Sequence, residues 1–188
     1  LGLDNRDVDR LAFECEKLAH GTPSGIDNNI ATYGEAVLFT RGTASRTRPI
    51  ELAEAPPLVI ACSGERGMTR DQVAGVRARY EKNRVMYDTL FSEIDELSLA
   101  GAVALRDRDY DALGAMMNVC HGFLNAIEVS TPTLEAMIDI ARRHGAVGAK
   151  LTGAGGGGSI VALCPGTADD VAAALQQAGY AIIRLSPA

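Results

Sequence analysis

The chain has 188 residues, enough for one medium domain or for one small domain and part of another. Hydrophobic residues make up 47% of it, so a packed core is expected, and the net charge is −6 at pH 7. This acidic balance, without any run of lysine and arginine, argues against a nucleic-acid or membrane partner held by bulk electrostatics. No apolar stretch approaches the ~18 residues of a membrane span and no signal peptide is visible, so we expect a cytoplasmic protein.

Residues 1–51 are predicted to contain one helix and a small polar sheet region. Apolar side chains recur at helical spacing from Leu3 to Leu18, which predicts an amphipathic helix followed by a segment dense in turn formers. Residues 30–39 are predicted to form one or two strands that turn at Gly34, and residues 41–48 a polar connection. This region lacks the apolar mass of a domain, so we expect it to complete a sheet whose other strands lie elsewhere.

Residues 52–188 are predicted to alternate strands with helices. The expected strands are at 57–62, 146–151, 159–164 and 180–185, and the expected helices at 69–80, 86–105, 110–127, 133–144 and 169–178. The helix at 133–144 has a Ser-Thr-Pro start signal in front of it. This pattern is typical of an α+β domain with a helix-covered antiparallel sheet of ferredoxin-like type.

Five glycines occupy six positions between Gly153 and Gly158. Glycine clusters allow positive φ angles and let backbone N–H groups converge on an anion, most often a phosphate. A dinucleotide fingerprint is excluded because a strand pattern, not a helix, follows the loop, and a Walker loop is excluded because Lys150 precedes the glycines. The loop therefore joins two strands, and it either cradles an anion or is a flexible hairpin connection.

Two carboxylates, Glu16 and Asp27, are predicted on a helix and on the glycine-containing turn that follows it. Such a pair could hold Mg²⁺ or accept a proton from a substrate. The alternative is that Asp27 caps a turn and Glu16 lies on a solvated helix face.

The remaining polar and sulfur-containing residues are expected to be structural. The histidines share no metal-ligand spacing and are predicted at packing or helix-end positions (His20, His121 and His144). The cysteines are dispersed and predicted to be buried free thiols (Cys15, Cys62, Cys120 and Cys164). Four methionines are predicted in the core (Met86, Met116, Met117 and Met137), and two arginine pairs on solvated helix faces (Arg77 with Arg79, Arg142 with Arg143).

Two motifs, in this order, resemble those of the GHMP small-molecule kinases and within them the mevalonate kinases. The first lies in residues 16–34 and contains His-Gly-Thr-Pro-Ser-Gly-Ile-Asp-Asn, and the second is Lys-Leu-Thr-Gly-Ala-Gly-Gly-Gly-Gly at residues 150–158. The resemblance implies a GHMP kinase C-terminal domain at 52–188 and, at 1–51, the last helix and strands of an S5-like N-terminal domain. It also implies ATP-dependent phosphorylation of the primary hydroxyl of mevalonate to 5-phosphomevalonate, in isoprenoid biosynthesis.

The resemblance assigns roles residue by residue. Asp27 matches the catalytic aspartate that activates or orients the hydroxyl, and Glu16 matches the Mg²⁺-coordinating glutamate. The nucleotide-phosphate loop corresponds to Gly153, Ala154, Gly155, Gly156, Gly157 and Gly158. Substrate contacts are expected from His20, Gly21, Ser24 and Thr69. The cofactor is Mg²⁺, and ATP is a substrate.

The chain also departs from the family pattern. The family's main phosphate loop and its N-terminal lysine do not occur in these 188 residues, so we expect the C-terminal part of a longer kinase, weakly active or inactive alone. Family members often carry a lysine where this chain has Glu65-Arg66, which leaves homoserine, phosphomevalonate or a sugar as alternative substrates. A non-catalytic ligand-binding or assembly module is a further alternative, and an uncovered sheet edge could support a homodimer.

Overall fold

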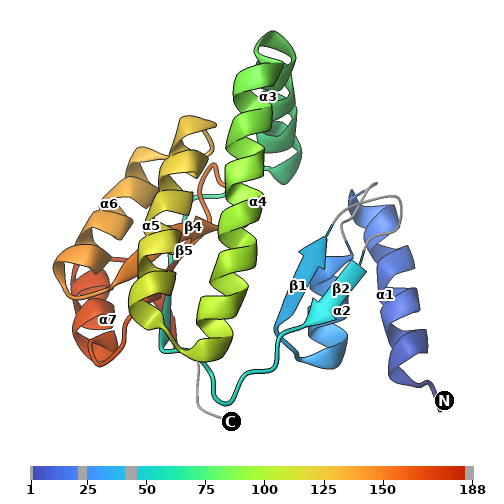
Figure 1. Cartoon of the computed structure of the whole chain (residues 1–188), viewed down its shortest axis with the longest axis horizontal. Coiled ribbons are helices and arrows are strands. Elements are labelled where there is room, and N and C mark those ends of the chain that lie inside the picture. The colour runs from blue at the N-terminus through green and yellow to red at the C-terminus, as the bar shows by residue number, and fades with distance from the viewer. Residues whose placement is uncertain (1, 21–24, 41–45, 185–188) are drawn as a thin grey trace. The chain divides into compact units, whose positions relative to one another are not determined.

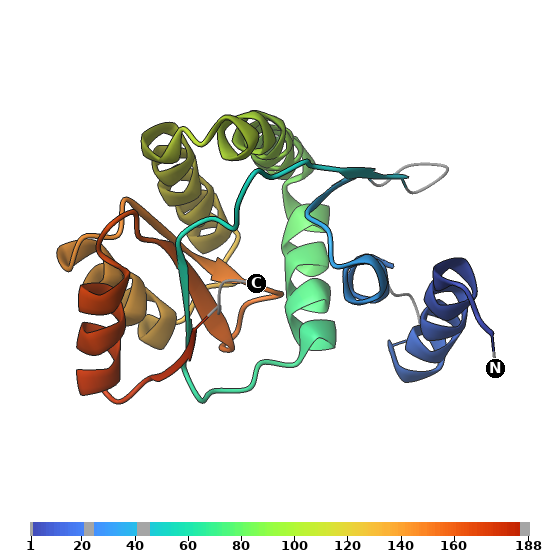
Figure 2. The ribbon, with the colours of Figure 1, turned by 90° about the horizontal axis from the view of Figure 1, so that it is seen from below.

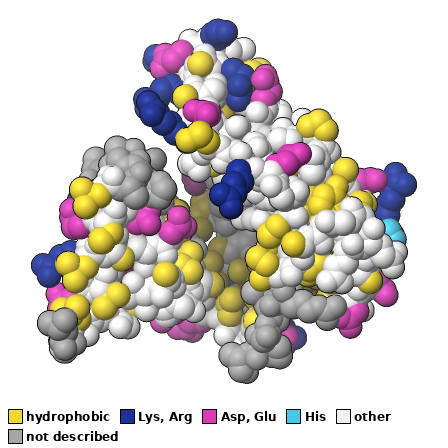
Figure 3. All heavy atoms as spheres, turned by 180° about the vertical axis from the view of Figure 1, so that it is seen from behind, with side chains coloured by type: hydrophobic (Ala, Val, Ile, Leu, Met, Phe, Trp, Pro, Cys, Tyr) yellow, Lys and Arg dark blue, Asp and Glu magenta, His cyan; other side chains and the backbone are white. Residues whose placement is uncertain are grey.

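The computed structural model describes residues 2–20, 25–40 and 46–184 (Figure 1). The chain forms two compact units, Leu1–Ala53 and Glu54–Ala188, which are described separately below. Within the described residues, no helix is both long enough and apolar enough to cross a membrane. On the face drawn in Figure 3, basic and acidic side chains are interspersed and do not gather into a patch of one sign.

The N-terminal unit consists of two helices and a two-stranded antiparallel ribbon. Its elements are α1 (Asn5–His20), α2 (Ile26–Tyr33), β1 (Val37–Thr40) and β2 (Arg46–Pro49). α1 and α2 pack together, and β1 pairs with β2 from Val37 opposite Pro49 to Thr40 opposite Arg46.

The prediction of strands from residue 30 to residue 39 is wrong for its first part, because α2 runs to Tyr33. Two glycines define this helix. Gly25 precedes it with φ +83°, and Gly34 follows it with φ +69° and donates its N–H to the Ile30 carbonyl at 2.8 Å. That bond is a helix C-terminal cap, so the glycine that suggested a strand turn ends a helix instead. Residues 46–48, predicted as part of a polar connection, belong instead to the strand β2, which pairs with β1.

The C-terminal unit confirms the predicted α+β class. Its strands are β3 (Leu58–Cys62), β4 (Gly148–Thr152), β5 (Ser159–Leu163) and β6 (Ala181–Arg184), and its helices are α3 (Thr69–Lys82), α4 (Arg84–Asp107), α5 (Tyr110–Ala126), α6 (Pro132–Arg143) and α7 (Ala168–Gln177). The strands form one antiparallel sheet in the order β4-β5-β3-β6, which is the ferredoxin-like order (Figures 1 and 2).

The core lies between this sheet and helices α6 and α7. Alternate strand residues face it, and Leu134, Met137 and Leu175 from the helices are fully buried. The start signal before α6 is confirmed, since the Thr131 hydroxyl accepts the Leu134 N–H at 3.3 Å and Pro132 is the first helical residue.

α5 covers the edge strand β4 at very close range. A Cβ on Gly114 would lie 2.7 Å from the Val147 carbonyl, and a Cβ on Gly148 would lie 2.5 Å from the Gly114 backbone. One helical turn on, the Asn118 side chain donates to the Val147 oxygen at 3.0 Å and accepts the Ala149 N–H at 3.1 Å. The amide of Asn118 therefore replaces a neighbouring strand at this edge of the sheet.

Two arginines predicted on solvated faces are used structurally instead. Arg79 donates to the Ile127 carbonyl, at the C-terminal end of α5, at 2.8 Å, and Arg142 donates to the Ala149 carbonyl at 3.1 Å. A cation at a helix C-terminus satisfies carbonyls that the helix leaves unpaired.

Two core predictions also fail. Met86 is 46% exposed on α4, whereas Met137 is buried as predicted. Cys15 is exposed on α1, while Cys164 is buried and its burial raises the pKa of the thiol to about 11. Both exceptions lie on helices whose apolar stripes are only partly covered within the described residues.

Candidate active site

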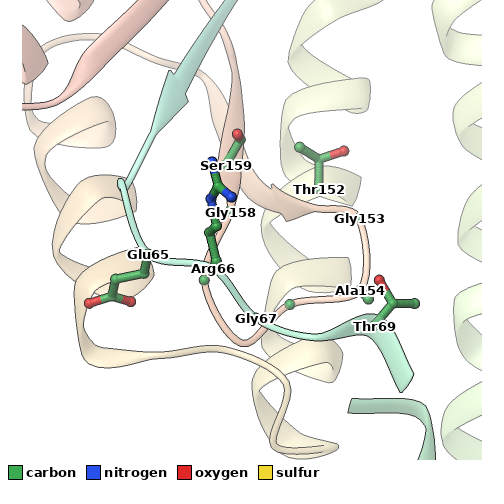
Figure 4. A pocket seen from close by; sticks show the side chains of 11 residues that line it. Glu65, Arg66, Gly67, Thr69, Thr152, Gly153, Ala154, Gly158 and Ser159 are labelled. Carbon is green, nitrogen blue, oxygen red and sulfur yellow. The ribbon is translucent and has the colours of Figure 1, made fainter. Parts of the chain in front are cut away.

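The glycine loop between β4 and β5 lines an open pocket of about 470 Å³ (Figure 4). Loop residues Gly153, Ala154, Gly155, Gly157 and Gly158 form one wall, and the segment from Glu65 to Thr69, which leads from β3 into α3, forms the other. Of the six loop residues predicted to contact phosphates, only Gly156 does not line the pocket.

The loop conformation requires glycine at several positions. The glycines at 153 and 155–158 have φ between +72° and +125°, a region that L-residues with side chains rarely adopt. A Cβ on Gly155 would lie 2.1 Å from the Val129 carbonyl oxygen, and a Cβ on Gly156 would lie 2.3 Å from the Gln72 amide nitrogen. The loop is therefore packed between neighbouring segments, not a loose hairpin connection.

Two of the loop amides are already used inside the protein. Gly156 donates its N–H to the Val129 carbonyl at 2.8 Å, and Gly158 donates to the Glu65 carbonyl at 2.9 Å. The amides at 153–155 and 157 have no hydrogen-bond acceptor within the described residues. An anion bound by this loop would draw on those remaining donors.

The opposite wall contributes the positive charge of the pocket. Figure 4 shows the Arg66 side chain extending toward Ser159 and Gly158, and the Glu65 carboxylate pointing away from the loop. The guanidinium of Arg66 has no ion-pair or hydrogen-bond partner in the part of the chain that the structure describes. Thr69 is the first residue of α3, so the N-terminal end of that helix, which carries partial positive charge, also lies at the pocket.

Lys150 does not contribute to this pocket, although it precedes the loop in sequence. Its ammonium donates to the Leu151 carbonyl at 2.9 Å, and burial lowers the pKa of its amine. It lines a separate, mostly apolar pocket of about 160 Å³ with residues of α4 and α5. Arg66 is thus the cation that belongs to the glycine loop, and sequence patterns alone did not single it out.

The two carboxylates lie on the packed helices of the N-terminal unit. Glu16 is half-buried on α1, and Asp27 is exposed in the first turn of α2, not on the irregular turn expected from the sequence. The neighbouring Asn28 is 7% exposed and donates to the Asp9 carboxylate at 2.6 Å. This bond fixes α2 on α1, so Asn28 sets the position of Asp27, a role that its place in an Asp-Asn pair did not reveal.

Three predicted substrate contacts lie outside the described residues, namely Gly21, Ser24 and the side chain of His20. Three or more possible metal-ligating side chains do not gather anywhere within the described residues. Nucleotide-bound Mg²⁺ needs only one or two protein carboxylates, because phosphates and water supply its other ligands.

The chain is similar to known proteins in both sequence and fold. Residues 102–181 match the family described as GHMP kinases C terminal. The chain is 35% identical to the mevalonate kinase of Thermococcus sibiricus over 184 residues, which are 95% of this chain and 54% of that protein. It is 37% identical to the mevalonate kinase of Methanothermobacter thermautotrophicus over 166 residues, which are 88% of this chain and 54% of that protein.

Solved structures of mevalonate kinases are also similar to this chain. The L. major mevalonate kinase in complex with R-mevalonate superposes with a TM-score of 0.88 at 33% identity, over 94% of this chain and 55% of that one. The chain spans about half the length of the curated relatives it matches.

Proposed function

We propose that the chain is part of a GHMP kinase and carries part of the active site of an ATP-dependent kinase for the primary hydroxyl of mevalonate, because residues 102–181 match the C-terminal domain of that family and nearly the whole chain is similar to mevalonate kinases. The observation that carries the substrate assignment is the similarity to mevalonate kinases over nearly the whole of this chain, including a structure that contains R-mevalonate. We also propose that residues 1–51 are the end of the family's first domain and residues 52–188 its second.

The chemistry requires little beyond positioning and neutralisation of charge. The alcohol oxygen forms a bond to the γ-phosphorus, the bond from that phosphorus to the β–γ bridging oxygen breaks, ADP leaves, and the hydroxyl proton passes to a base. In this proposal Asp27 orients the hydroxyl and accepts its proton. The amides of the glycine loop that have no acceptor and the Arg66 guanidinium bind phosphate oxygens. Two observations support that role: these amides make no hydrogen bond within the described residues, and the Arg66 side chain extends toward Ser159 and Gly158.

Mg²⁺ would be held by Glu16, and when bound it would neutralise charge on the nucleotide phosphates. Thr69, at the N-terminus of α3, and the segment containing His20, Gly21 and Ser24 would contact the alcohol. Arg66 could bind an anionic group of ATP or of the alcohol, and therefore does not by itself select mevalonate. A kinase for homoserine, phosphomevalonate or a sugar is the second candidate.

The test uses the full-length protein and measures ADP release with Mg-ATP. Mevalonate, homoserine, phosphomevalonate and galactose are offered separately, and we expect turnover with mevalonate alone. Asp27→Ala should lower kcat by about 100-fold or more, since positioned proton acceptors contribute on that order. The matched control is Glu14→Gln, an exposed carboxylate on α1 paired with Lys17 at 2.7 Å, which should leave kcat unchanged.

Each result has a separate meaning. Turnover with another alcohol would keep the kinase and replace the substrate. Full activity in Asp27→Ala would remove its catalytic role. No ADP release with any of the four would favour a binding or assembly module.

A further inference from the structure

The carboxylate of Glu65 lies at the start of α6 and points away from the glycine loop (Figure 4). It accepts the Thr133 hydroxyl at 2.6 Å and the Thr131 hydroxyl at 3.4 Å. Thr131 is also the residue that caps α6, through its bond from the Leu134 N–H. A carboxylate at a helix N-terminus is stabilised by the partial positive charge there, and hydrogen bonds to an ionised acceptor are stronger than neutral ones.

The backbone of the same residue contacts the glycine loop. The Glu65 carbonyl accepts the Gly158 N–H at 2.9 Å, and a Cβ on Gly157 would lie 3.0 Å from the Glu65 Cβ. Glu65 therefore joins the C-terminal half of the loop to the start of α6.

A second connection runs from the loop to the segment just before α6. The carbonyl of Val129, which is four residues before Thr133 in the chain, accepts the Gly156 N–H at 2.8 Å. The contacts thus form a closed circuit from the loop through Glu65 to Thr133, back along the chain to Val129 and again to the loop. The bond between the Thr133 hydroxyl and the Glu65 carboxylate is the one link in this circuit that is made by side chains, so it is the link that a substitution can open.

The circuit also separates two opposite charges. Glu65 and Arg66 are adjacent, and Figure 4 shows their side chains pointing in different directions, with Arg66 toward Ser159 in the pocket. Bonding to the two threonines keeps the negative charge of Glu65 away from a site that would bind phosphates, since like charges in one pocket repel.

We propose that Glu65 is a positioning residue, which fixes the glycine loop and the inward orientation of Arg66 by binding the N-terminal end of α6. This inference rests on the proposed function, in that the loop and Arg66 are taken to bind the phosphates of ATP. In this proposal the Glu65 carboxylate acts through the glycine loop and Arg66.

The experiment compares four variants of the full-length protein. Thr133→Val and Glu65→Gln weaken the hydrogen bond between Thr133 and Glu65 while nearly preserving the shape of the side chain. Thr133→Ser keeps the hydroxyl, and Glu93→Gln is a control at an exposed position on α4. For Thr133→Val and Glu65→Gln we expect a rise of about three- to tenfold in KM for Mg-ATP, with KM for the alcohol unchanged, as suits a partly exposed charge-assisted bond. Thr133→Ser and Glu93→Gln should behave as wild type.

Amide hydrogen exchange of the 152–160 segment gives a readout independent of turnover. It should be faster in Thr133→Val and Glu65→Gln, and unchanged in Thr133→Ser. Wild-type exchange together with a wild-type KM for ATP in both weakened variants would overturn the proposal. So would a loss of thermal stability with neither value altered, because that indicates a purely structural contact.

The two proposals fail in different ways. If wild-type protein releases no ADP with any alcohol, the kinase assignment falls, and exchange in the loop still decides whether Glu65 orders it. If Glu65→Gln does not fold, Thr133→Val leaves the carboxylate in place and carries the test.

Discussion

Substituting Gly155 by alanine tests whether the glycine loop is shaped by conformation alone or also by contact with the segment before α6. Gly155 has φ +80°, and its Cβ would lie 2.1 Å from the Val129 carbonyl oxygen. The same carbonyl accepts the Gly156 N–H at 2.8 Å, so moving it away would break that bond. Gly153 is the matched control, because its φ is nearly the same, +79°, and nothing lies within 4 Å of its Cβ position.

The two substitutions share one cost and differ in another. Placing an L-residue in the left-handed region costs ~1–2 kcal/mol, so the free energy of unfolding should fall by that amount in both variants. Gly155→Ala also loses the Gly156 hydrogen bond and leaves a carbonyl unsatisfied, which adds ~1–3 kcal/mol. We therefore expect the free energy of unfolding to fall by about 1 kcal/mol in Gly153→Ala and by about 3 kcal/mol in Gly155→Ala.

Urea unfolding followed by far-ultraviolet circular dichroism measures the free energy of unfolding of both variants. The slope of that free energy with urea concentration should stay the same as in the wild type. In the active protein, KM for Mg-ATP should rise more in Gly155→Ala than in Gly153→Ala, since only the former displaces the loop. Equal losses of stability in the two variants would refute the reasoning, because they would mean that the loop relaxes freely and is not packed against Val129.

Two further predictions concern α5. Gly114→Ala should destabilise the protein by ~2 kcal/mol or more, because its Cβ would overlap Val147. Gly122→Ala in the same helix meets nothing within 4 Å and should stabilise the protein by ~0.5–1 kcal/mol. Thermal unfolding of both variants measures these changes, and a stabilised Gly114→Ala would contradict the close approach of α5 to β4. Burial lowers the pKa of His121, against the opposing effect of Glu135, so the unfolded state binds a proton more readily and stability should fall as the pH drops below 6.5, the ordinary value of histidine. That pH dependence should disappear in His121→Gln, measured by urea unfolding at pH 7.5 and 5.5, and its persistence would assign it to another group.

Local signals carried much of the fold prediction. The helix start at Thr131-Pro132 and the strands on both sides of the glycine loop follow from patterns within a few residues of one another. The errors arise where tertiary contacts override such signals. Residues 30–33 look like a strand, yet α2 is held in place by the bond from Asn28 to Asp9, nineteen residues earlier in the chain.

The same distinction applies to the candidate site. Glycine clustering predicted where a phosphate could bind, because the need for positive φ is local to each glycine. It could not predict which amides stay available, since Gly156 and Gly158 are used by Val129 and Glu65, which lie far away in sequence.

The charge of the site has the same long-range origin. From sequence, Glu65-Arg66 is only an acid next to a base. In the folded chain the acid is bound to a helix that begins 67 residues further on, at Pro132, and the base is left to face the loop. The bond of the acid to α6 therefore leaves the arginine of a neutral dipeptide facing the glycine loop.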